Sequence, residues 1–171
     1  MSAATRVRQT TAVVQAPYDG VDLAGWLRGL TSEEYIGFTP RSGTHKSHAV
    51  VAEDGGFVFE SVESLGGTKI RHRYVAKVME RDRIECISPD SRGRFLRAVP
   101  VRFETTWALS AGMLNPNTAE LTCRIQVKYR NALWMWLSFL SGTPFWLRLH
   151  SNEETPRMAA SIARHARRHT G

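Results

Sequence analysis

The C-terminal part of the chain contains a long amphipathic stretch that needs a broad apolar surface to pack against. Pro144–Arg168 carries apolar side chains at helical spacing, whereas its arginines fall largely elsewhere. Proline suits the first helical turn, because an N–H at that position has no partner inside the helix. Pro156 should kink this helix or restart it at Thr155. The predicted inward residues of the helix are Phe145, Leu149, Met158 and Ile162.

The middle of the chain, residues 44–130, predicts such a surface. Apolar and polar residues alternate there in short segments that are separated by turn residues, which is typical of antiparallel strands with one wet face. In the clearest segment, 68–80, His72 and Tyr74 lie on the apolar face, opposite a row of basic residues. Strands are predicted over residues 44–52, 57–63, 68–80, 83–88, 101–109 and 120–130, with a turn-rich loop over 88–93. The dry face of this sheet must be covered, and the C-terminal helix is the available cover.

The N-terminal region predicts one further strand and two short helices. Residues 5–14 alternate like a strand, and residues 23–30 place apolar side chains at helical spacing. Thr31 and Glu34 form a capping box that begins a second helix. A chain of 171 residues can enclose both a core and a cavity, so we interpret residues 1–171 as a single domain.

The net charge of +7 and the isoelectric point near 10.0 come largely from scattered arginines. Such a surface permits loose attraction to nucleic acids or anionic membranes but does not build a site. The aromatic residues alternate toward the inside of the predicted sheet, opposite the arginines, so we do not expect a nucleic-acid partner.

Cysteine content and targeting signals favour the cytoplasm. Cys86 and Cys123 have no partner at metal-ligand spacing, which fits a reducing compartment. The first residues lack the apolar core of a signal peptide. The strongly apolar run 133–149 is interrupted by Ser-Gly-Thr-Pro, so we expect no stable membrane insertion.

The predicted order of strand, two helices, six strands and a long helix resembles the helix-grip fold of START-like (Bet v 1-like, SRPBCC) proteins. The segment 14–18, Val-Gln-Ala-Pro-Tyr, is similar to the way that family leads into its first helix. The segment 150–162 is similar to the last helix of bacterial polyketide cyclases and aromatases, from which Pro156 and the Trp-rich segment 133–140 depart. The resemblance implies an α+β fold in which a curved, seven-stranded antiparallel sheet wraps around the C-terminal helix. A lipocalin-like barrel is the structural alternative.

The same resemblance implies a cavity between the sheet and the helix. His72 and Tyr74 face it from the best strand, and His150 and Glu154 lie one helical turn apart. Histidine can transfer a proton near neutral pH, and tyrosine can hold a carbonyl or enolate oxygen, so His72, Tyr74 and His150 are the candidate catalytic residues. The candidate ligand-binding residues are Phe103, Trp107, Tyr129, Trp146, Met158 and Glu154. In the strand order of this fold another strand separates those of Cys86 and Cys123, so both should stay reduced.

Three functions remain open from the sequence. The first is binding of a hydrophobic, aromatic or polyketide-like small molecule, with cyclisation or dehydration by acid–base chemistry. The second is a non-catalytic carrier of a hydrophobic ligand or lipid, in which the histidines are satisfied pocket residues. The third is a metal-dependent hydrolase in which His150, Glu154 and a strand histidine bind zinc. We expect neither a metal nor a cofactor, and we expect a monomer or a homodimer.

Overall fold

A computed structural model describes residues 4–52, 56–65, 68–95, 99–130, 132–140 and 142–169. Its strands are β1 (Ala4–Val14), β2 (His45–Ala52), β3 (Val58–Leu65), β4 (Thr68–Met79), β5 (Arg83–Phe95), β6 (Val99–Asn115) and β7 (Thr118–Tyr129). Its helices are the 3-10 turn η1 (Tyr18–Gly20), α1 (Leu23–Arg28), α2 (Ser32–Gly37), α3 (Ala132–Leu140) and α4 (Thr143–His169).

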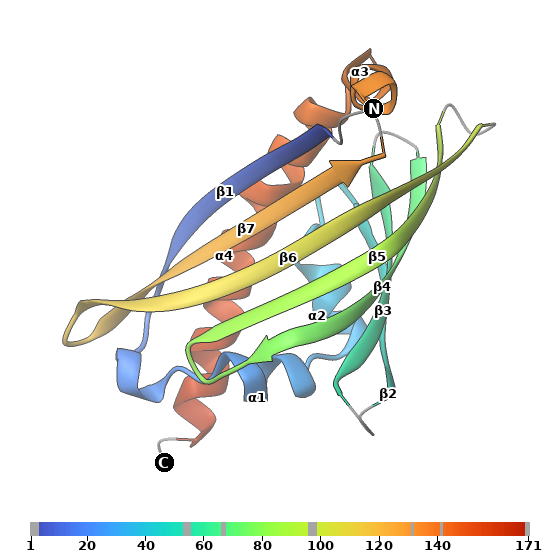
Figure 1. The fold of residues 1–171 in the computed structure, drawn as a ribbon. Helices are drawn as coiled ribbons and strands as arrows, with labels where there is room; N and C mark the ends of the chain where they lie inside the picture. Colours follow the sequence, from blue (N-terminus) through green and yellow to red (C-terminus); the bar gives the residue numbers. More distant parts are fainter. Residues whose placement is uncertain are drawn as a thin grey trace.

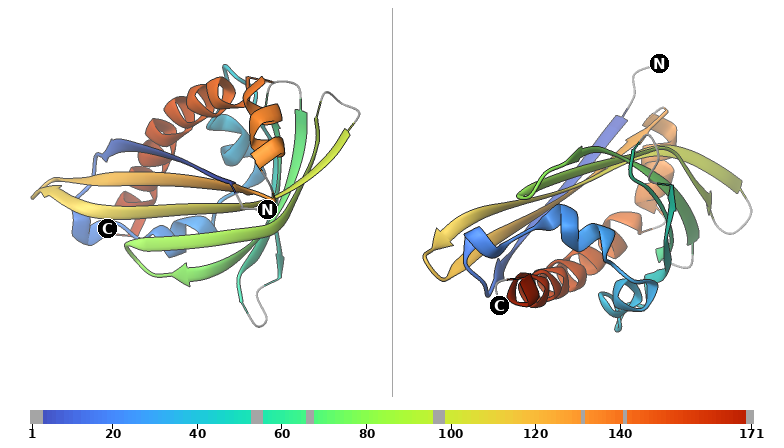
Figure 2. Two further views of the ribbon diagram at one scale, coloured as in Figure 1. Left: turned by 45° about the horizontal axis from the view of Figure 1, so that its top comes forward. Right: turned by 90° about the horizontal axis from the view of Figure 1, so that it is seen from below.

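The strands form one antiparallel seven-stranded sheet in the order β1-β7-β6-β5-β4-β3-β2. The sheet curves around α4, which lies along its concave side, and α1 and α2 cover the remaining opening (Figures 1 and 2). β1 and β2 are the two edges of the described sheet, so it is open, unlike the closed barrel of a lipocalin. The predicted helix-grip architecture is therefore confirmed.

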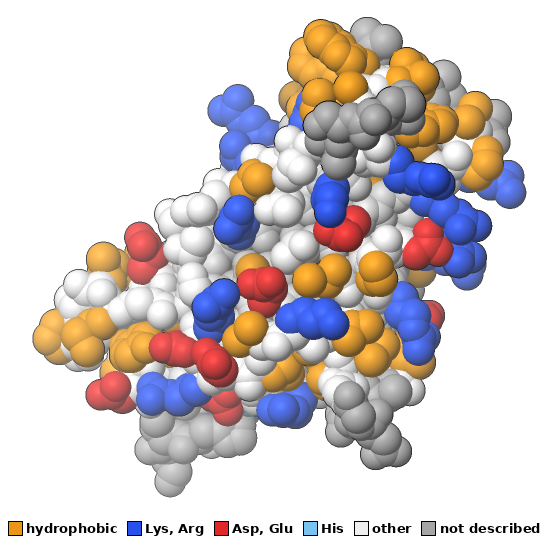
Figure 3. Space-filling model, in the orientation of Figure 1, with side chains coloured by type: hydrophobic (Ala, Val, Ile, Leu, Met, Phe, Trp, Pro, Cys, Tyr) orange, Lys and Arg blue, Asp and Glu red, His pale blue; other side chains and the backbone are white. Residues whose placement is uncertain are grey.

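The convex face of the sheet is exposed to solvent. Lys and Arg side chains are interspersed with Asp and Glu over the face that Figure 3 shows. Alternation along β4 produces this two-sidedness, because its residues switch between buried and exposed through Ile70, His72 and Tyr74. A strand with this pattern stabilises the fold only when its apolar side is covered.

Two hydrogen bonds, one buried and one partly buried, attach the short helices to α4. The indole N–H of Trp26 donates to Oγ of Ser161 at 2.7 Å, and the Ser161 hydroxyl donates to Oε1 of Glu34 at 2.6 Å. At the start of α2, Oγ1 of Thr31 accepts from the backbone N–H of Glu34, so the predicted cap of this helix is confirmed. The Glu34 carboxylate, however, bonds across to α4 instead of turning back to its own helix.

The predicted loop over 88–93 is wrong, because β5 continues through it to Phe95. The register of β5 with β6 shifts between Ser88 and Ser91, which marks a β-bulge at Pro89 and Asp90. A proline is tolerated at a bulge because one residue there makes no ladder hydrogen bond. The turn-forming residues therefore bend a long strand without ending it.

The prediction for the C-terminal helix is correct in part. α4 runs without interruption from Thr143 to His169, so no restart occurs at Thr155, whose hydroxyl donates to the Ser151 carbonyl oxygen one turn earlier. Met158 and Ile162 are buried as predicted. The inward assignment of Phe145 and Leu149 is wrong, because their side chains are 63% and 41% exposed.

The physical reason is that polar residues occupy part of the inward face of α4. His150, Ser151, Glu154 and Thr155 are all buried, so the apolar stripe alone gives the wrong rotation of the first two turns. Further along, small side chains let the helix approach the sheet and α1 closely. These buried residues are Ala159, Ala163 and Ala166.

The Trp-rich segment forms α3, which lies at one end of the molecule and exposes apolar side chains there (Figures 1 and 3). Trp136 is 63% exposed, and Leu133 and Phe139 are exposed beside it, so these side chains belong neither to the core nor to a pocket wall. Among the helices of the described residues, none combines the length and apolarity needed to cross a bilayer.

Candidate functional site

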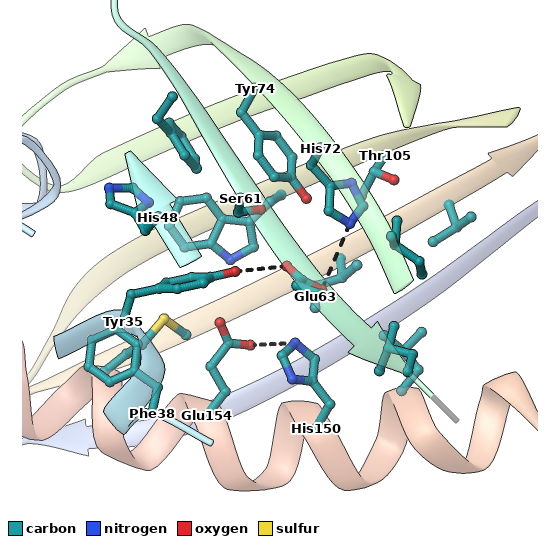
Figure 4. Close-up of a pocket in the computed structure, with 18 of the residues that line it drawn as sticks. Tyr35, Phe38, His48, Ser61, Glu63, His72, Tyr74, Thr105, His150 and Glu154 are labelled. Atoms are coloured by element: carbon teal, nitrogen blue, oxygen red, sulfur yellow. Dashed lines mark hydrogen bonds and ion pairs between the residues drawn. The ribbon is translucent and has the colours of Figure 1, made fainter. Parts of the chain in front are cut away.

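A largely apolar cavity lies between the concave face of the sheet and α4 (Figure 4). Residues from β3, β4, β6 and β7 line one side, and residues from α2 and α4 line the other. Eight of the nine residues that the sequence proposes for the site line this cavity. They are His72, Tyr74, Phe103, Trp107, Tyr129, His150, Glu154 and Met158. Trp146 is not part of the lining; its ring contacts Phe145 at the start of α4.

Glu63 connects α2 to the sheet inside the cavity. Its Oε1 accepts a 2.9 Å hydrogen bond from the hydroxyl of Tyr35, and its Oε2 lies 3.8 Å from Nε2 of His72. The imidazole of His72 stacks on the ring of Tyr74 with 5.2 Å between centroids. These four side chains form one contiguous group at the wall of the cavity (Figure 4).

The bulge in β5 supplies the second partner of His72. Oγ of Ser91 lies 2.9 Å from Nδ1 of His72, and it also lies 3.0 Å from the hydroxyl oxygens of Ser88 and Thr105. Nδ1 of a neutral His72 donates to Oγ of Ser91 in one tautomer of the ring and accepts from the Ser91 hydroxyl in the other. The imidazole is therefore held from both sides.

A second polar group lies where α4 faces β2. Nε2 of His150 is 3.1 Å from Oε2 of Glu154, and Nε2 of His45 is 3.4 Å from Oε1 of the same carboxylate. The ring of His45 stacks on Tyr35 with 3.8 Å between centroids, and its Nδ1 lies 2.7 Å from the Tyr35 carbonyl oxygen. The three side chains are all buried.

The two groups hold their protons differently. Burial lowers the pKa of His72, although the charge of Glu63 acts in the opposite direction. Burial also opposes the charge of His150, but the nearby carboxylate of Glu154 outweighs it and raises the pKa of His150 to about 9. Burial raises the pKa of Glu63, but the surrounding imidazoles, His72 foremost, outweigh it and lower that pKa to about 2. Glu63 is therefore ionised at neutral pH.

Solved structures show the same fold at low sequence identity. A START superfamily protein from Mycobacterium smegmatis aligns over 87% of this chain and 94% of its own, with a TM-score of 0.52 and 11% identity. The Zhui aromatase/cyclase of a Streptomyces species aligns over 98% of this chain and 97% of its own, with a TM-score of 0.54 and 16% identity. The chain has the START-like helix-grip fold. Norcoclaurine synthase from Thalictrum flavum aligns over 100% of this START-like chain and 99% of its own, with a TM-score of 0.60 and 11% identity. No family model and no curated protein matches the sequence.

Sequence reasoning missed Tyr35 and Glu63, which line the cavity, and His45, which is not part of the lining but contacts Glu154. A signal for Glu63 was present, because it shares the parity of Phe59 on β3 and of Phe57 just before the strand. Glu60 instead faces outward and pairs with Arg73 at 2.8 Å. The burial of His45 could not be predicted from such alternation. The register of β2 with β3 shifts between His45 and Ser47, so His45 and His48 are both buried despite their odd spacing.

Proposed function

We propose that the START-like cavity binds a hydrophobic, aromatic or polyketide-like small molecule and that His72 transfers a proton during its cyclisation or dehydration. The observation that carries this proposal is the contiguous group of Tyr35, Glu63, His72 and Tyr74 in an otherwise apolar cavity. Polar side chains that converge in an apolar pocket are the arrangement expected of an acid–base site.

Three residues of this group, His72, Glu63 and Tyr74, have distinct roles in the proposal. His72, whose pKa burial lowers, is neutral at neutral pH and acts as the base through Nε2, in the tautomer whose Nδ1 donates to Ser91. Glu63 stabilises the imidazolium that forms, because its carboxylate lies against Nε2 at 3.8 Å. Tyr74 orients a carbonyl oxygen of the ligand, and the aromatic rings of Phe103, Trp107 and Tyr129 form the wall.

The names of two structural neighbours support this direction. One is an aromatase/cyclase, and another is norcoclaurine synthase in complex with dopamine and hydroxybenzaldehyde. Both names refer to aromatic compounds. The alternative function is a non-catalytic carrier, which is favoured by the predominance of apolar side chains in the lining.

The test begins with native mass spectrometry of freshly purified protein, to detect a small molecule that co-purifies. Turnover and affinity are then measured with that molecule for wild type and for His72→Gln. We expect the variant to lose turnover by roughly 10²–10⁴-fold with little change in affinity, which is the usual contribution of a general base. The matched control is Arg71→Gln, an adjacent residue on the exposed face of β4, which should keep full turnover. Full turnover by His72→Gln contradicts the assignment, and a bound molecule that wild type never turns over establishes the carrier.

We further propose a bacterial, cytoplasmic protein whose single domain spans residues 1–171 and acts as a monomer or homodimer. Two unpaired cysteines support the reducing compartment, and one continuous sheet with its covering helices supports the single domain. Light scattering during size-exclusion chromatography checks the oligomeric state against the chain mass of 19.2 kDa.

A further inference from the structure

The group formed by His45, His150 and Glu154 is not used by the proposed proton transfer. These residues offer one ligand atom each, and the three atoms lie within 4.8 Å of one another. His150 and Glu154 come from successive turns of α4 and point from the helix into the cavity (Figure 4). His45 reaches them from the start of β2.

The tautomer of His45 is determined by its surroundings. A carbonyl oxygen only accepts hydrogen bonds, so Nδ1 of His45 must carry the proton that it donates to Tyr35 at 2.7 Å. In a neutral ring Nε2 then presents a lone pair toward Glu154. A histidine whose other ring nitrogen donates to a backbone carbonyl is the usual arrangement of a metal ligand.

Three atoms of this group lack a hydrogen-bond partner although they are buried. Within the described part of the chain they are Nε2 of His45, Nδ1 of His150 and Oε2 of Glu154, although Oε2 also forms the ion pair with Nε2 of His150. A lone pair of Nε2 therefore faces a carboxylate oxygen at 3.4 Å with no donor between them. Buried polar atoms are almost always satisfied, and a metal cation held by the lone pairs of the three side chains is one way to satisfy Nε2 of His45 and the Glu154 carboxylate together.

The nitrogen–oxygen separations are close to those between two ligands of one metal ion. Zinc binds imidazole nitrogen and carboxylate oxygen at about 2.0–2.2 Å, which places two ligands of a tetrahedral ion roughly 3.3 Å apart. The nitrogen–oxygen distances here are 3.4 Å for His45 and 3.1 Å for His150. The carboxylates of Glu63 and Glu154 both face this apolar cavity, so a cation also offsets their charge.

We propose that His45, His150 and Glu154 form a three-ligand site for a divalent transition-metal cation of the zinc class, with an open coordination position toward the cavity. Two histidines and one glutamate are a known ligand set for catalytic zinc, which keeps one position for water or substrate. Because His150 and Glu154 line the cavity, an oxygen of the bound molecule can reach that position. The site is independent of proton transfer at His72.

The first test uses untagged wild-type protein that has been freed of metal by a chelator. Titration with Zn²⁺ in a calorimeter should show about one ion per chain with a Kd tighter than about 1 µM. Replacement of Zn²⁺ by Co²⁺ should produce the visible absorption of a four- or five-coordinate cobalt site with nitrogen and oxygen ligands. Binding of less than about 0.1 ion per chain, or Co²⁺ that keeps the spectrum of its aqueous ion, overturns the proposal.

The second test assigns the ligands. His45→Gln, His150→Gln and Glu154→Gln should each weaken Zn²⁺ binding by more than about 100-fold, because even residues behind the ligands cost 10–100-fold. The matched control is His48→Gln, a buried histidine on the same strand that lies outside the group and should stay within about threefold of wild type. Equal losses in the control and the ligand variants contradict the assignment. Circular dichroism identifies any variant that fails to fold, and the wild-type titration decides the proposal independently of that variant.

The outcome is separable from that of the proposed function. Small-molecule binding and turnover are measured with and without chelator, whereas the Zn²⁺ titration requires no small molecule. A nuclear magnetic resonance titration in which Zn²⁺ leaves the signals of His45 and His150 unchanged is a further result that overturns the metal site. Their selective perturbation supports it.

Discussion

The hydroxyl of Tyr35 donates a 2.9 Å hydrogen bond to the carboxylate of Glu63, which joins α2 to β3 across the cavity. Burial raises the pKa of the Tyr35 phenol well above its usual value, so this group stays protonated and remains a donor at every physiological pH. A buried carboxylate that loses a donor keeps its desolvation cost, so this contact matters for stability as well as for the site.

Tyr35→Phe should therefore lower the free energy of unfolding by roughly 1.5–3 kcal/mol, the range for hydrogen bonds to charged groups. Urea unfolding monitored by fluorescence measures the change. Tyr18→Phe is the matched control, because Tyr18 donates to Asp82 at 2.6 Å from a site that water can reach. The control should lose less stability; a larger loss there than at Tyr35 contradicts the prediction.

The acid sensitivity of the fold should depend in part on His48. Burial lowers the pKa of His48 to about 4, against 6.5 for an unperturbed histidine, and neither ring nitrogen has a hydrogen-bond partner among the described residues. Between pH 6.5 and 4, His48 is protonated in the unfolded chain but stays neutral in the folded chain. The free energy of unfolding therefore falls as the pH falls. With allowance for partial solvent screening, the loss is roughly 1–3 kcal/mol.

His48→Phe removes this titration and keeps an aromatic ring beside Tyr35 and Phe59. The unfolding free energies of wild type and variant, measured at pH 7 and pH 4.5, should differ in their pH dependence, with the smaller loss in the variant. Parallel losses in the two proteins show that His48 does not contribute to acid sensitivity.

The two cysteines should be unreactive and unpaired in the folded protein. Cys86 on β5 and Cys123 on β7 are both free and buried, and β6 lies between their strands. Strands two positions apart are separated by about 9–10 Å, which exceeds the reach of a disulfide. Burial raises the pKa of Cys86 to about 12 and also raises that of Cys123, so neither is a thiolate at neutral pH.

A thiol reagent added at pH 8 should label no cysteine until guanidine unfolds the chain, and then should label both. The intact mass under non-reducing conditions should equal that of the dithiol. A mass lower by two hydrogens, or rapid labelling of the native protein, contradicts this prediction.

Trp26 on α1 and Trp136 on α3 should differ sharply in the effect of truncation on stability. Trp26 is buried and bonded to Ser161, so Trp26→Ala should lower the free energy of unfolding by about 3–5 kcal/mol. Trp136 on α3 is mostly exposed, so Trp136→Ala should stay within about 0.5 kcal/mol of wild type. Thermal and urea unfolding measure both. A large loss at Trp136 places its side chain in a core, contrary to its exposure in this structure.

The regular strands show how far local sequence determines this protein. His72 and Tyr74 on β4 face the cavity together with Trp107 on β6 and Tyr129 on β7, as their alternation predicts. In an unbroken strand the side-chain direction repeats every two residues. Once the buried side of one residue is known, the strand geometry therefore assigns every other side chain to a face of the sheet. The order of elements and the need to cover one dry face then predict the helix-grip arrangement.

Only the tertiary structure decides where that repeat is interrupted. The bulges near His45 and Ser91 arise from pairing with neighbouring strands, and they bring into the interior two polar side chains that alternation cannot place. The rotation of α4 about its own axis likewise depends on tertiary packing, because His150 and Glu154 are buried whereas Phe145 is exposed. The sequence by itself thus determined the architecture and the sheet side of the cavity, through local backbone geometry. The polar groups around Glu63 and Glu154 depend on contacts between distant segments, and only the packed structure brings them together.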